Sequence, residues 1–243
     1  YNYYTELNPY EGEDGITMVI APAWGIIFPP YNIARLSGLL RHYGYRVTVH
    51  DLNIECYHYC KENHDKDFWE SRYYFAWERP VSDDEVFPII KPKLDESIEK
   101  ILEEGDDIVG FSVYLTNLLS TMYMIEQIKK RSPSTKIVVG GPEAFNDWFE
   151  DLIYNTLKFK SGVIDFRITG EGEQELLTLL ENYKELPMSK DMITFGGFQS
   201  KLDLNQLPFP DYSDYDLNLY QHPEGASIET SRGCVAKCSF CAE

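Results

Sequence analysis

Basic residues are scarce in this sequence of 243 residues. It has 22 lysines and arginines against 40 aspartates and glutamates, which gives a formal net charge of −18 at pH 7. Because such a surface repels phosphate backbones and anionic lipid headgroups, we expect no nucleic acid and no membrane among its partners. The sequence also lacks an apolar run long enough to cross a bilayer, and it opens on nothing that resembles a signal peptide. These absences predict a cytoplasmic protein.

Cysteine is also rare, but three of the five cysteines fall together, at the spacing C-x3-C-x2-C: Cys234, Cys238 and Cys241. Cysteine thiolates are the usual ligands of iron–sulfur clusters, and three of them leave one iron of a four-iron cluster open to another ligand. A structural zinc site is the alternative, but it requires a fourth cysteine or histidine. The nearest upstream candidate is His222. A third possibility is that the thiols bind nothing.

Ahead of this motif, short apolar segments alternate with amphipathic helical patterns. Short apolar runs bounded by turn residues are typical of buried strands, and the predicted strands are 16–21, 45–50, 107–113, 136–139 and 165–169. Apolar residues at helical spacing predict helices within 33–43, 94–102, 118–131, 145–153 and 176–183. The sequence therefore predicts an α/β fold with a doubly wound, five-stranded parallel sheet of the Rossmann-like kind. Such sheets bind ligands at the carboxyl ends of their strands, which here are the loops 22–30, 112–117, 140–143 and 170–173.

Residues 53–93 interrupt the alternation with an insertion dense in aromatic residues. Long connections in compact domains are often binding loops or lids. The insertion is predicted either to lie over a ligand or to pack as a helical excursion against the sheet edge. It also holds Cys56, His58 and Cys60. Two buried thiols explain this group more simply than a metal site, because the spacing completes no recognised ligand set.

Residues 187–225 are predicted to join the sheet to the cysteine motif. A small hairpin is expected at 192–200, followed by a proline-punctuated linker around Leu207-Pro-Phe-Pro210, and 226–230 is expected to be a strand. The sequence begins at Tyr1 rather than at a methionine and ends two residues after Cys241. Both ends are therefore expected to be cut.

The cysteine spacing, with Phe240 directly before the last cysteine, resembles the signature of radical S-adenosylmethionine enzymes. The resemblance implies that the three cysteines hold a 4Fe-4S cluster whose open iron binds S-adenosylmethionine, and that residues 226–230 form the first strand of a (β/α) barrel. It also implies an electron donor such as flavodoxin or ferredoxin, and a small-molecule or peptide substrate. Most of the barrel would lie outside the sequence, so residues 1–243 alone are expected to be inactive.

A second resemblance lies in the segments Ser112-Val-Tyr114 and Gly140-Gly141. Their order and spacing are similar to the Ser-x-Leu and Gly-Gly portions of cobalamin-binding domains, which line the channel for the nucleotide tail and the corrin edge. A cobalamin domain directly ahead of C-x3-C-x2-C is the arrangement of cobalamin-binding radical S-adenosylmethionine enzymes. The cofactor-binding residues that the resemblance implies are Trp24, Ser112, Tyr114, Gly140, Gly141, Gly170 and Glu171.

The loop after the first predicted strand departs from that family. Cobalamin domains that ligate cobalt carry Asp-x-His-x-x-Gly in this loop, whereas residues 21–30 contain no histidine. Two interpretations follow from the departure. Cobalamin is bound without a histidine ligand to cobalt, or the domain has kept the fold and lost the cofactor.

We therefore predict a cobalamin-dependent radical S-adenosylmethionine enzyme, most simply a methyltransferase, although no catalytic residue can be named. The predicted divisions are a cobalamin-binding domain at 1–186, a hairpin and linker at 187–225, and the start of the radical domain at 226–243. One alternative is a methylthiotransferase acting on transfer RNA, which would need a second cysteine trio where only Cys56 and Cys60 remain. The other is a non-catalytic module that binds cobalamin or a nucleotide.

Overall fold

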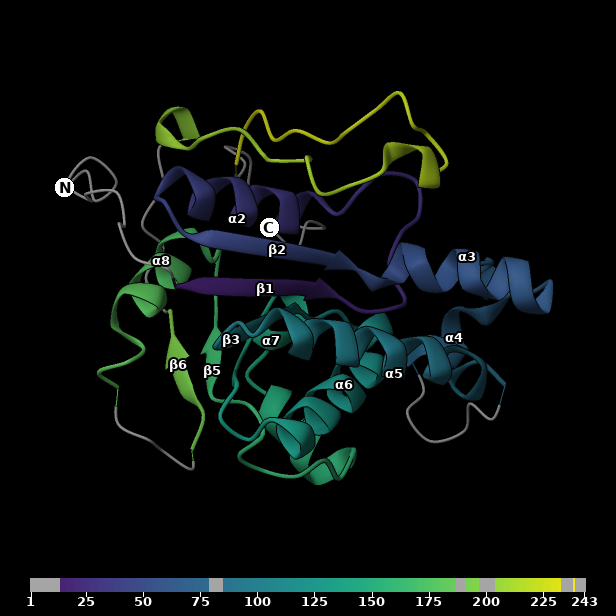
Figure 1. The fold of residues 1–243 in the computed structure, drawn as a ribbon, viewed down its shortest axis with the longest axis horizontal. Coiled ribbons are helices and arrows are strands. Elements are labelled where there is room, and N and C mark those ends of the chain that lie inside the picture. Colours follow the sequence, from purple (N-terminus) through teal and green to yellow (C-terminus); the bar gives the residue numbers. More distant parts are fainter. Residues whose placement is uncertain (1–13, 79–84, 187–190, 197–203, 233–237, 239–243) are drawn as a thin grey trace.

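The computed structural model describes residues 14–78, 85–186, 191–196, 204–232 and 238. Its centre is a parallel sheet of six strands, and Figure 1 shows their arrangement. The strands are β1 (Gly15–Ile20), β2 (Arg46–Asp51), β3 (Ile108–Ser112), β4 (Lys136–Gly140), β5 (Phe166–Ile168) and β6 (Ile193–Phe195). All neighbouring pairs run parallel. The predicted α/β fold is confirmed, with one strand more than the sequence indicated.

The strand order is β2-β1-β3-β4-β5-β6. The chain therefore moves outward in one direction from β1 to β2, and then crosses back to place β3 on the other side of β1. In an open α/β sheet, ligands bind in the crevice where the order reverses, beyond the carboxyl ends of the strands. This topological switch point lies between β1 and β3, and it brings the loops that follow these two strands together.

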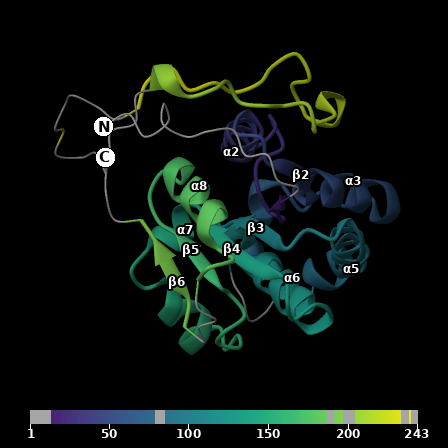
Figure 2. The ribbon, with the colours of Figure 1, turned by 60° about the vertical axis from the view of Figure 1, so that its left-hand side comes forward.

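Helices cover both faces of the sheet because side chains alternate along each strand. On one face, Ile16, Met18 and Ile20 of β1 pack with α2 (Tyr31–His42) and α8 (Glu173–Asn182). On the other face, Val19 of β1 and Val109 of β3 pack with α3 (Leu52–His64), α5 (Phe87–Glu104) and α6 (Leu118–Arg131). Figure 2 shows α8 on the opposite side of the sheet from α5 and α6.

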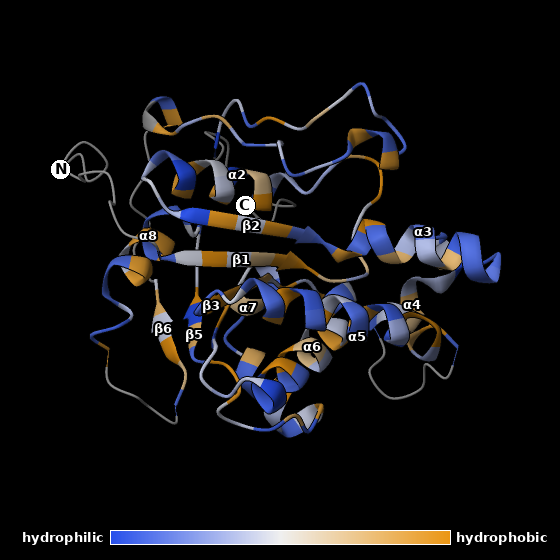
Figure 3. Ribbon diagram, in the orientation of Figure 1, coloured by the Kyte–Doolittle hydropathy of each residue, from blue (hydrophilic) through white to orange (hydrophobic). Residues whose placement is uncertain are grey.

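The aromatic insertion is helical. It begins with α3, continues through the short helix α4 (Tyr74–Glu78), and ends where α5 starts at Phe87, earlier than the sequence predicted. Phe68 is fully buried and Trp77 nearly so, because both join the core beneath α5 and α6. The prediction of a helical excursion is confirmed, and Figure 3 shows α3 and α4 on the right, beyond the carboxyl ends of β1 and β2.

The single helix predicted over 145–153 is wrong. The structure instead has the short helix α7 (Pro142–Phe145) and a separate π-helical turn, Asp151–Thr156. Phe149 and Ile153 are fully buried, as expected, but Phe145 is 60% exposed and Trp148 is 49% exposed. The apolar pattern was read as one continuous face, whereas the backbone leaves the helical region at Asn146 and turns two of the rings outward.

The joining segment differs from the prediction in two ways. Ile193–Phe195 adds β6 to the sheet beside β5; the second half of the expected hairpin lies outside the described residues, so the hairpin stays a prediction. The strand predicted at 226–230 is wrong, because these residues belong to no strand, and the start of a barrel is not seen. The proposed boundaries at residues 186 and 225 stay predictions.

Residues 204–232, called the arm from here on, run back over α2 and the loop after β1, above α2 in Figure 1. The Asp211 amide donates to the Ala34 carbonyl at 2.8 Å, and Arg41 pairs with Asp211 and Asp214 at 2.5 and 2.7 Å. A Cβ at Gly38 would lie only 2.6 Å from the Phe209 carbonyl oxygen. This glycine therefore lets the arm contact the helix backbone closely.

Candidate functional site

A cavity of about 510 Å³ lies between α2, α8 and the carboxyl ends of β3 and β4. This α2–α8 cavity is near the switch point of the sheet. Its walls are mainly apolar, with Met18, Ile33, Val138 and Leu176 contributed by two strands and two helices. Its volume is within the usual range for small-molecule sites, roughly 300–1,000 Å³. The cavity can therefore hold a largely apolar group of nucleotide-base size.

Glycines form the end of this cavity because the backbone turns sharply there. Gly141 has φ of +97° and Gly170 has φ of +98°, a conformation that side chains with a Cβ rarely adopt. A Cβ at Gly141 would lie 2.9 Å from both the backbone nitrogen and the oxygen of Val113. A Cβ at Gly170 would meet nothing within 4 Å. Gly141 thus permits close contact between two loops, whereas Gly170 leaves open space.

The loop after β3 is held in place by Asn117, whose side chain is fully buried. Its Nδ2 donates to the Ser112 carbonyl at 2.9 Å, and its Oδ1 accepts from the Tyr114 amide at 2.8 Å. The Ser112 hydroxyl accepts a hydrogen bond of 2.5 Å from Asn32 of α2. These bonds fix Ser112 and Tyr114 at the cavity, and burial raises the pKa of the Tyr114 hydroxyl.

A second cavity, of about 470 Å³, lies between the loop after β1, the insertion and the loop after β3. We call it the aromatic cavity because four of its lining residues are Trp24, Trp69, Tyr74 and Trp77. The Trp24 ring is stacked on Tyr114, with centroids 4.0 Å apart and planes inclined by 31°. Tyr114 lines both cavities. The Trp24–Tyr114 pair therefore stands at the border between them.

Asn53, fully buried at the start of α3, positions the tryptophans of the aromatic cavity. Its Oδ1 accepts from the Trp24 amide and from the Trp69 ring nitrogen, both at 2.7 Å. Its Nδ2 donates to the Gly25 carbonyl at 3.1 Å. One amide side chain thus joins the loop after β1 to the insertion. The insertion packs on the sheet and also forms a wall of the aromatic cavity, and its predicted role over a ligand stays a prediction.

Histidine contributes to neither cavity in the described part of the chain. His222 lies in the arm, where its ring is 5.6 Å from that of Phe28 and its Nδ1 is 3.1 Å from Glu224. The loop 21–30, which lacks histidine, lies against the arm: the Ile26 and Ile27 carbonyls accept from the amides of Gln221 and His222. A ligand in these cavities would therefore meet aromatic and apolar groups rather than an imidazole.

Cys56 and Cys60 are free, fully buried thiols on α3. Burial raises the pKa of Cys56 well above its ordinary value and that of Cys60 to about 12. Because a metal binds the thiolate and not the thiol, these groups suit packing better than ligation. Within the described residues, no cluster of three or more histidine, cysteine, aspartate or glutamate side chains could hold a metal ion.

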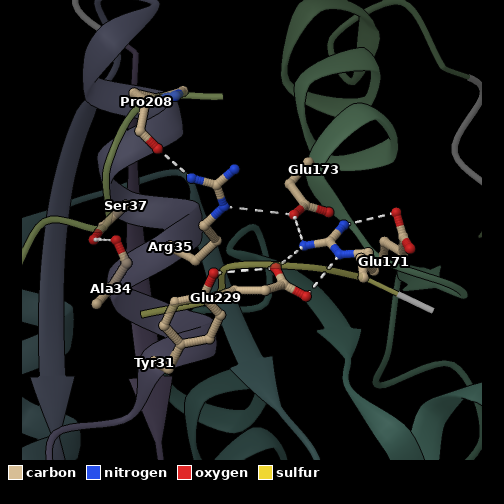
Figure 4. A network of polar contacts seen from close by, with 9 residues as sticks. Tyr31, Ala34, Arg35, Ser37, Glu171, Glu173, Pro208 and Glu229 are labelled. Carbon is tan, nitrogen blue, oxygen red and sulfur yellow. Dashed lines mark hydrogen bonds and ion pairs between the residues drawn. The ribbon is translucent and has the colours of Figure 1, made fainter. Parts of the chain in front are cut away.

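Of the three cysteines in the C-x3-C-x2-C motif, the structure describes only Cys238, which is exposed. Cys234 and Cys241 lie outside the described residues, so the predicted cluster site stays a prediction. The structure describes the segment that leads to the motif as far as Arg232. This arginine bonds to Glu171, Glu173 and Glu229, in the network drawn in Figure 4.

Six of the seven residues that the sequence associated with a cofactor line the α2–α8 cavity: Ser112, Tyr114, Gly140, Gly141, Gly170 and Glu171. The seventh, Trp24, lines the aromatic cavity and contacts Tyr114. The sequence did not reveal Asn32, which bonds to Ser112, or Arg232. An Asn in the first turn of a helix has no sequence pattern that marks it as a binding residue. Arg232 meets Glu171 and Glu173 only because the arm folds back over the domain.

The comparisons with known proteins agree with this geometry. Residues 82–180 match the family model described as the B12 binding domain, a stretch that contains β3, β4 and the glycine loops. No helix in the described ranges is both long and apolar enough to cross a membrane.

Three curated relatives are similar to longer parts of the chain. Cytidylyl-2-hydroxyethylphosphonate methyltransferase of Streptomyces wedmorensis is 24% identical over 87% of the chain and 43% of its own length. Hopanoid C-3 methylase of Methylococcus capsulatus is 33% identical over 60% of the chain and 30% of its own length. A putative methylthiotransferase of Methanocaldococcus jannaschii is 32% identical over 59% of the chain and 31% of its own length.

The chain thus spans less than half the length of each of these relatives. Its B12-binding match covers the loops that line the α2–α8 cavity, and two of the relatives are methylating enzymes. The sequence ends in the C-x3-C-x2-C motif. The chain is thus similar to a B12 binding domain over residues 82–180 and to methylating enzymes over longer parts, as the resemblance to cobalamin-binding radical S-adenosylmethionine enzymes predicted.

Proposed function

We propose that this chain supplies the cobalamin-binding domain and the cluster-binding motif of a radical S-adenosylmethionine methyltransferase. The observation that supports it most is the α2–α8 cavity, because six of the seven residues implied by sequence resemblance converge on this one space from three separate loops. The proposed substrate is a small molecule or a peptide, and the proposed electron donor is a protein such as flavodoxin or ferredoxin.

The residues present suit the nucleotide tail of cobalamin. An aromatic base fits between the apolar side chains of α2 and α8, and the backbone at Gly140 and Gly141 is bare where a Cβ would narrow the cavity or clash with Val113. Glycine also lets a ligand approach the backbone closely. Ser112 and Asn32 add a polar pair beside this apolar space.

The corrin ring would then lie over the carboxyl ends of β1 and β3, beside the Trp24–Tyr114 pair. With no imidazole lining either cavity among the described residues, cobalt would have no histidine ligand. When bound, methylcobalamin supplies a methyl group, and the cluster with S-adenosylmethionine supplies a radical that activates the substrate. The contribution of this chain is to bind and orient these groups and to shield them with apolar walls.

Absorbance of the full-length protein, reconstituted anaerobically with iron, sulfide and hydroxocobalamin, tests the proposal. We expect a corrin band together with iron–sulfur absorbance after removal of unbound cofactors. A corrin band without iron–sulfur absorbance would favour the non-catalytic module, and iron–sulfur absorbance without a corrin band would mean that the domain has kept the fold but lost the cofactor.

Iron counting on five cysteine variants tests the cluster assignment. Replacing Cys234, Cys238 or Cys241 with alanine should abolish the cluster, because an iron that loses its thiolate has only a weaker ligand or solvent to replace it. Replacing Cys56 or Cys60, the matched controls, should leave the iron content unchanged, since both are buried in the core of the insertion.

Similarity to the putative methylthiotransferase of M. jannaschii favours one second candidate, a radical methylthiotransferase. That class would need another cysteine trio, and the two remaining cysteines are buried with raised pKa values. Loss of iron from the Cys56 variant would support this candidate against the first. Iron retention in both controls would oppose it.

A further inference from the structure

Arg232 ends the described part of the arm, two residues before Cys234 in the sequence. Its guanidinium donates to three carboxylates: to Glu171 at 2.7 Å, to Glu173 at 2.8 Å, and to Glu229 at 3.0 and 2.6 Å. Glu171 and Glu173 belong to the loop and first turn of α8, so these bonds fasten the entry to the cysteine motif onto the cobalamin-binding domain. Figure 4 shows the carboxylates grouped between α2 and α8.

Glu173 is the central carboxylate of this network, with a side chain that is only 1% exposed. It lies between two guanidiniums, that of Arg232 and that of Arg35 on α2, whose Nε is 3.7 Å from Glu173 Oε1. A buried carboxylate requires such partners, because leaving it unpaired costs far more than the pair itself contributes. Arg35 also donates to the Pro208 carbonyl. The network therefore joins α2, α8 and two points of the arm.

Glu171 gives the network its connection to the cofactor site. It lines the α2–α8 cavity together with Gly170 and Gly172, and it is the partner of Arg232 Nη1. Both glycines have positive φ, so this wall is a backbone turn with no packed side chain of its own apart from Glu171. The position of this wall therefore depends on the partners of Glu171 and Glu173, and Arg232 is a partner of both.

We propose that Arg232 is a positioning residue that holds the 170–173 wall of the α2–α8 cavity and, through the same guanidinium, anchors the end of the described arm on that wall. Without Arg232, three carboxylates would remain close together with only Arg35 to compensate them. They would repel one another, and the wall would move away from the arm. The inference rests on the proposed function, because it takes cobalamin as the occupant of the cavity.

Tryptophan fluorescence titrated with hydroxocobalamin, on the full-length protein, tests this role. Trp24 and Trp69 line the neighbouring aromatic cavity, beside the proposed position of the corrin ring, so binding should quench their emission. We expect Arg232→Gln to weaken binding by about 3- to 10-fold, the loss of one charge-assisted contact to the wall. Arg232→Lys should restore part of the affinity, since an ammonium keeps the charge but cannot bond to three carboxylates in one plane.

Arg41→Gln is the matched control. Arg41 anchors the same arm through Asp211 and Asp214, with a side chain of similar exposure, 26% against 22% for Arg232, but it bonds to no residue of the cavity wall. We expect its affinity to stay within about twofold of the wild type, because a loosened arm alone leaves Glu171 and Glu173 paired.

Glu171→Gln gives a second variant at a half-exposed position, and it tests the coupling directly. If the two residues act together, the effect of Arg232→Gln should be smaller in the Glu171→Gln background than in the wild type. Affinity of Arg232→Gln equal to that of the wild type, or an equal loss in Arg41→Gln, would overturn the positioning role while leaving the proposed function intact. A wild-type protein that binds no cobalamin would overturn both.

Discussion

Gly141 and Gly170 have nearly the same φ, +97° and +98°, yet their surroundings differ. At Gly141 the backbone of Val113 occupies the space that a side chain would need, and the Glu143 amide donates to the Val113 carbonyl nearby at 3.1 Å. At Gly170 the space is open. Gly170 is therefore required only by its backbone conformation, whereas Gly141 is required both by its conformation and by the close contact with Val113.

Replacing each glycine with alanine measures how much unfolding free energy the two effects contribute. Gly170→Ala should cost about 1 kcal/mol of unfolding free energy from strain at positive φ alone. Gly141→Ala should cost about 2–4 kcal/mol, because the loop backbone must also move, and it should weaken cobalamin binding. Urea unfolding of both variants provides the comparison. Equal losses would show that the contact between the two loops does not require a glycine.

At the scale of an element, helix α3 begins at Asp51, whose carboxylate also forms a hydrogen bond with the arm. Asp51 accepts from the Ile54 amide at 2.9 Å, as an N-cap, and from the Tyr220 hydroxyl at 2.6 Å. Burial raises the pKa of Asp51 to about 6, despite these two hydrogen bonds. The first turn of the insertion and the end of the sheet are thus joined to the arm through one buried acid.

This acid predicts a pH dependence whose sign follows from the direction of the shift. Between its ordinary pKa of 3.8 and about 6, the folded state keeps a proton that the unfolded state releases, so stability rises as pH falls from about 6 towards 4. The full difference is about 3 kcal/mol. Asp51→Asn keeps one oxygen to accept from the Ile54 amide, and its Nδ2 can donate to the Tyr220 hydroxyl instead of accepting from it; because this amide does not titrate, the variant should lack the slope. Urea unfolding of both proteins at pH 7, 6 and 5 measures it, and parallel curves would contradict the assignment.

Strands β1 and β3 could be predicted because they are buried along their whole length, so Ile16–Ile20 and Ile108–Phe111 are mainly apolar runs. Strand β6, Ile193–Phe195, could not be predicted as part of the sheet, since its three residues are only half-buried or exposed and it stands at the edge, beside β5. The interruption of the predicted helix 145–153 at Asn146 could not be predicted either. The rings of this segment repeat at helical spacing, and only the tertiary structure turns Phe145 and Trp148 outward.

At the scale of the whole molecule, the cavity could be predicted because parallel strands place all their carboxyl ends at one edge. Once β3 and β4 are neighbours, Ser112 pairs with Gly140 in the sheet register. The aromatic cavity and the Arg232 network could not be predicted, since they depend on how the insertion and the arm fold back over the sheet. Asn53 bonds to Trp24 and Trp69, 29 and 16 positions away in the sequence, and Arg232 bonds to Glu171 and Glu173, 61 and 59 positions away.

The central claim is that cobalamin binds at the β1–β3 switch point with no histidine on cobalt, and electron paramagnetic resonance of the Co(II) form in the full-length protein tests it most directly. Because no described histidine lines either cavity, the account predicts a signal without superhyperfine splitting from an axial nitrogen. A resolved splitting from one axial nitrogen would contradict it, and isotopic labelling of the protein's histidines with ¹⁵N would show whether that nitrogen comes from the chain.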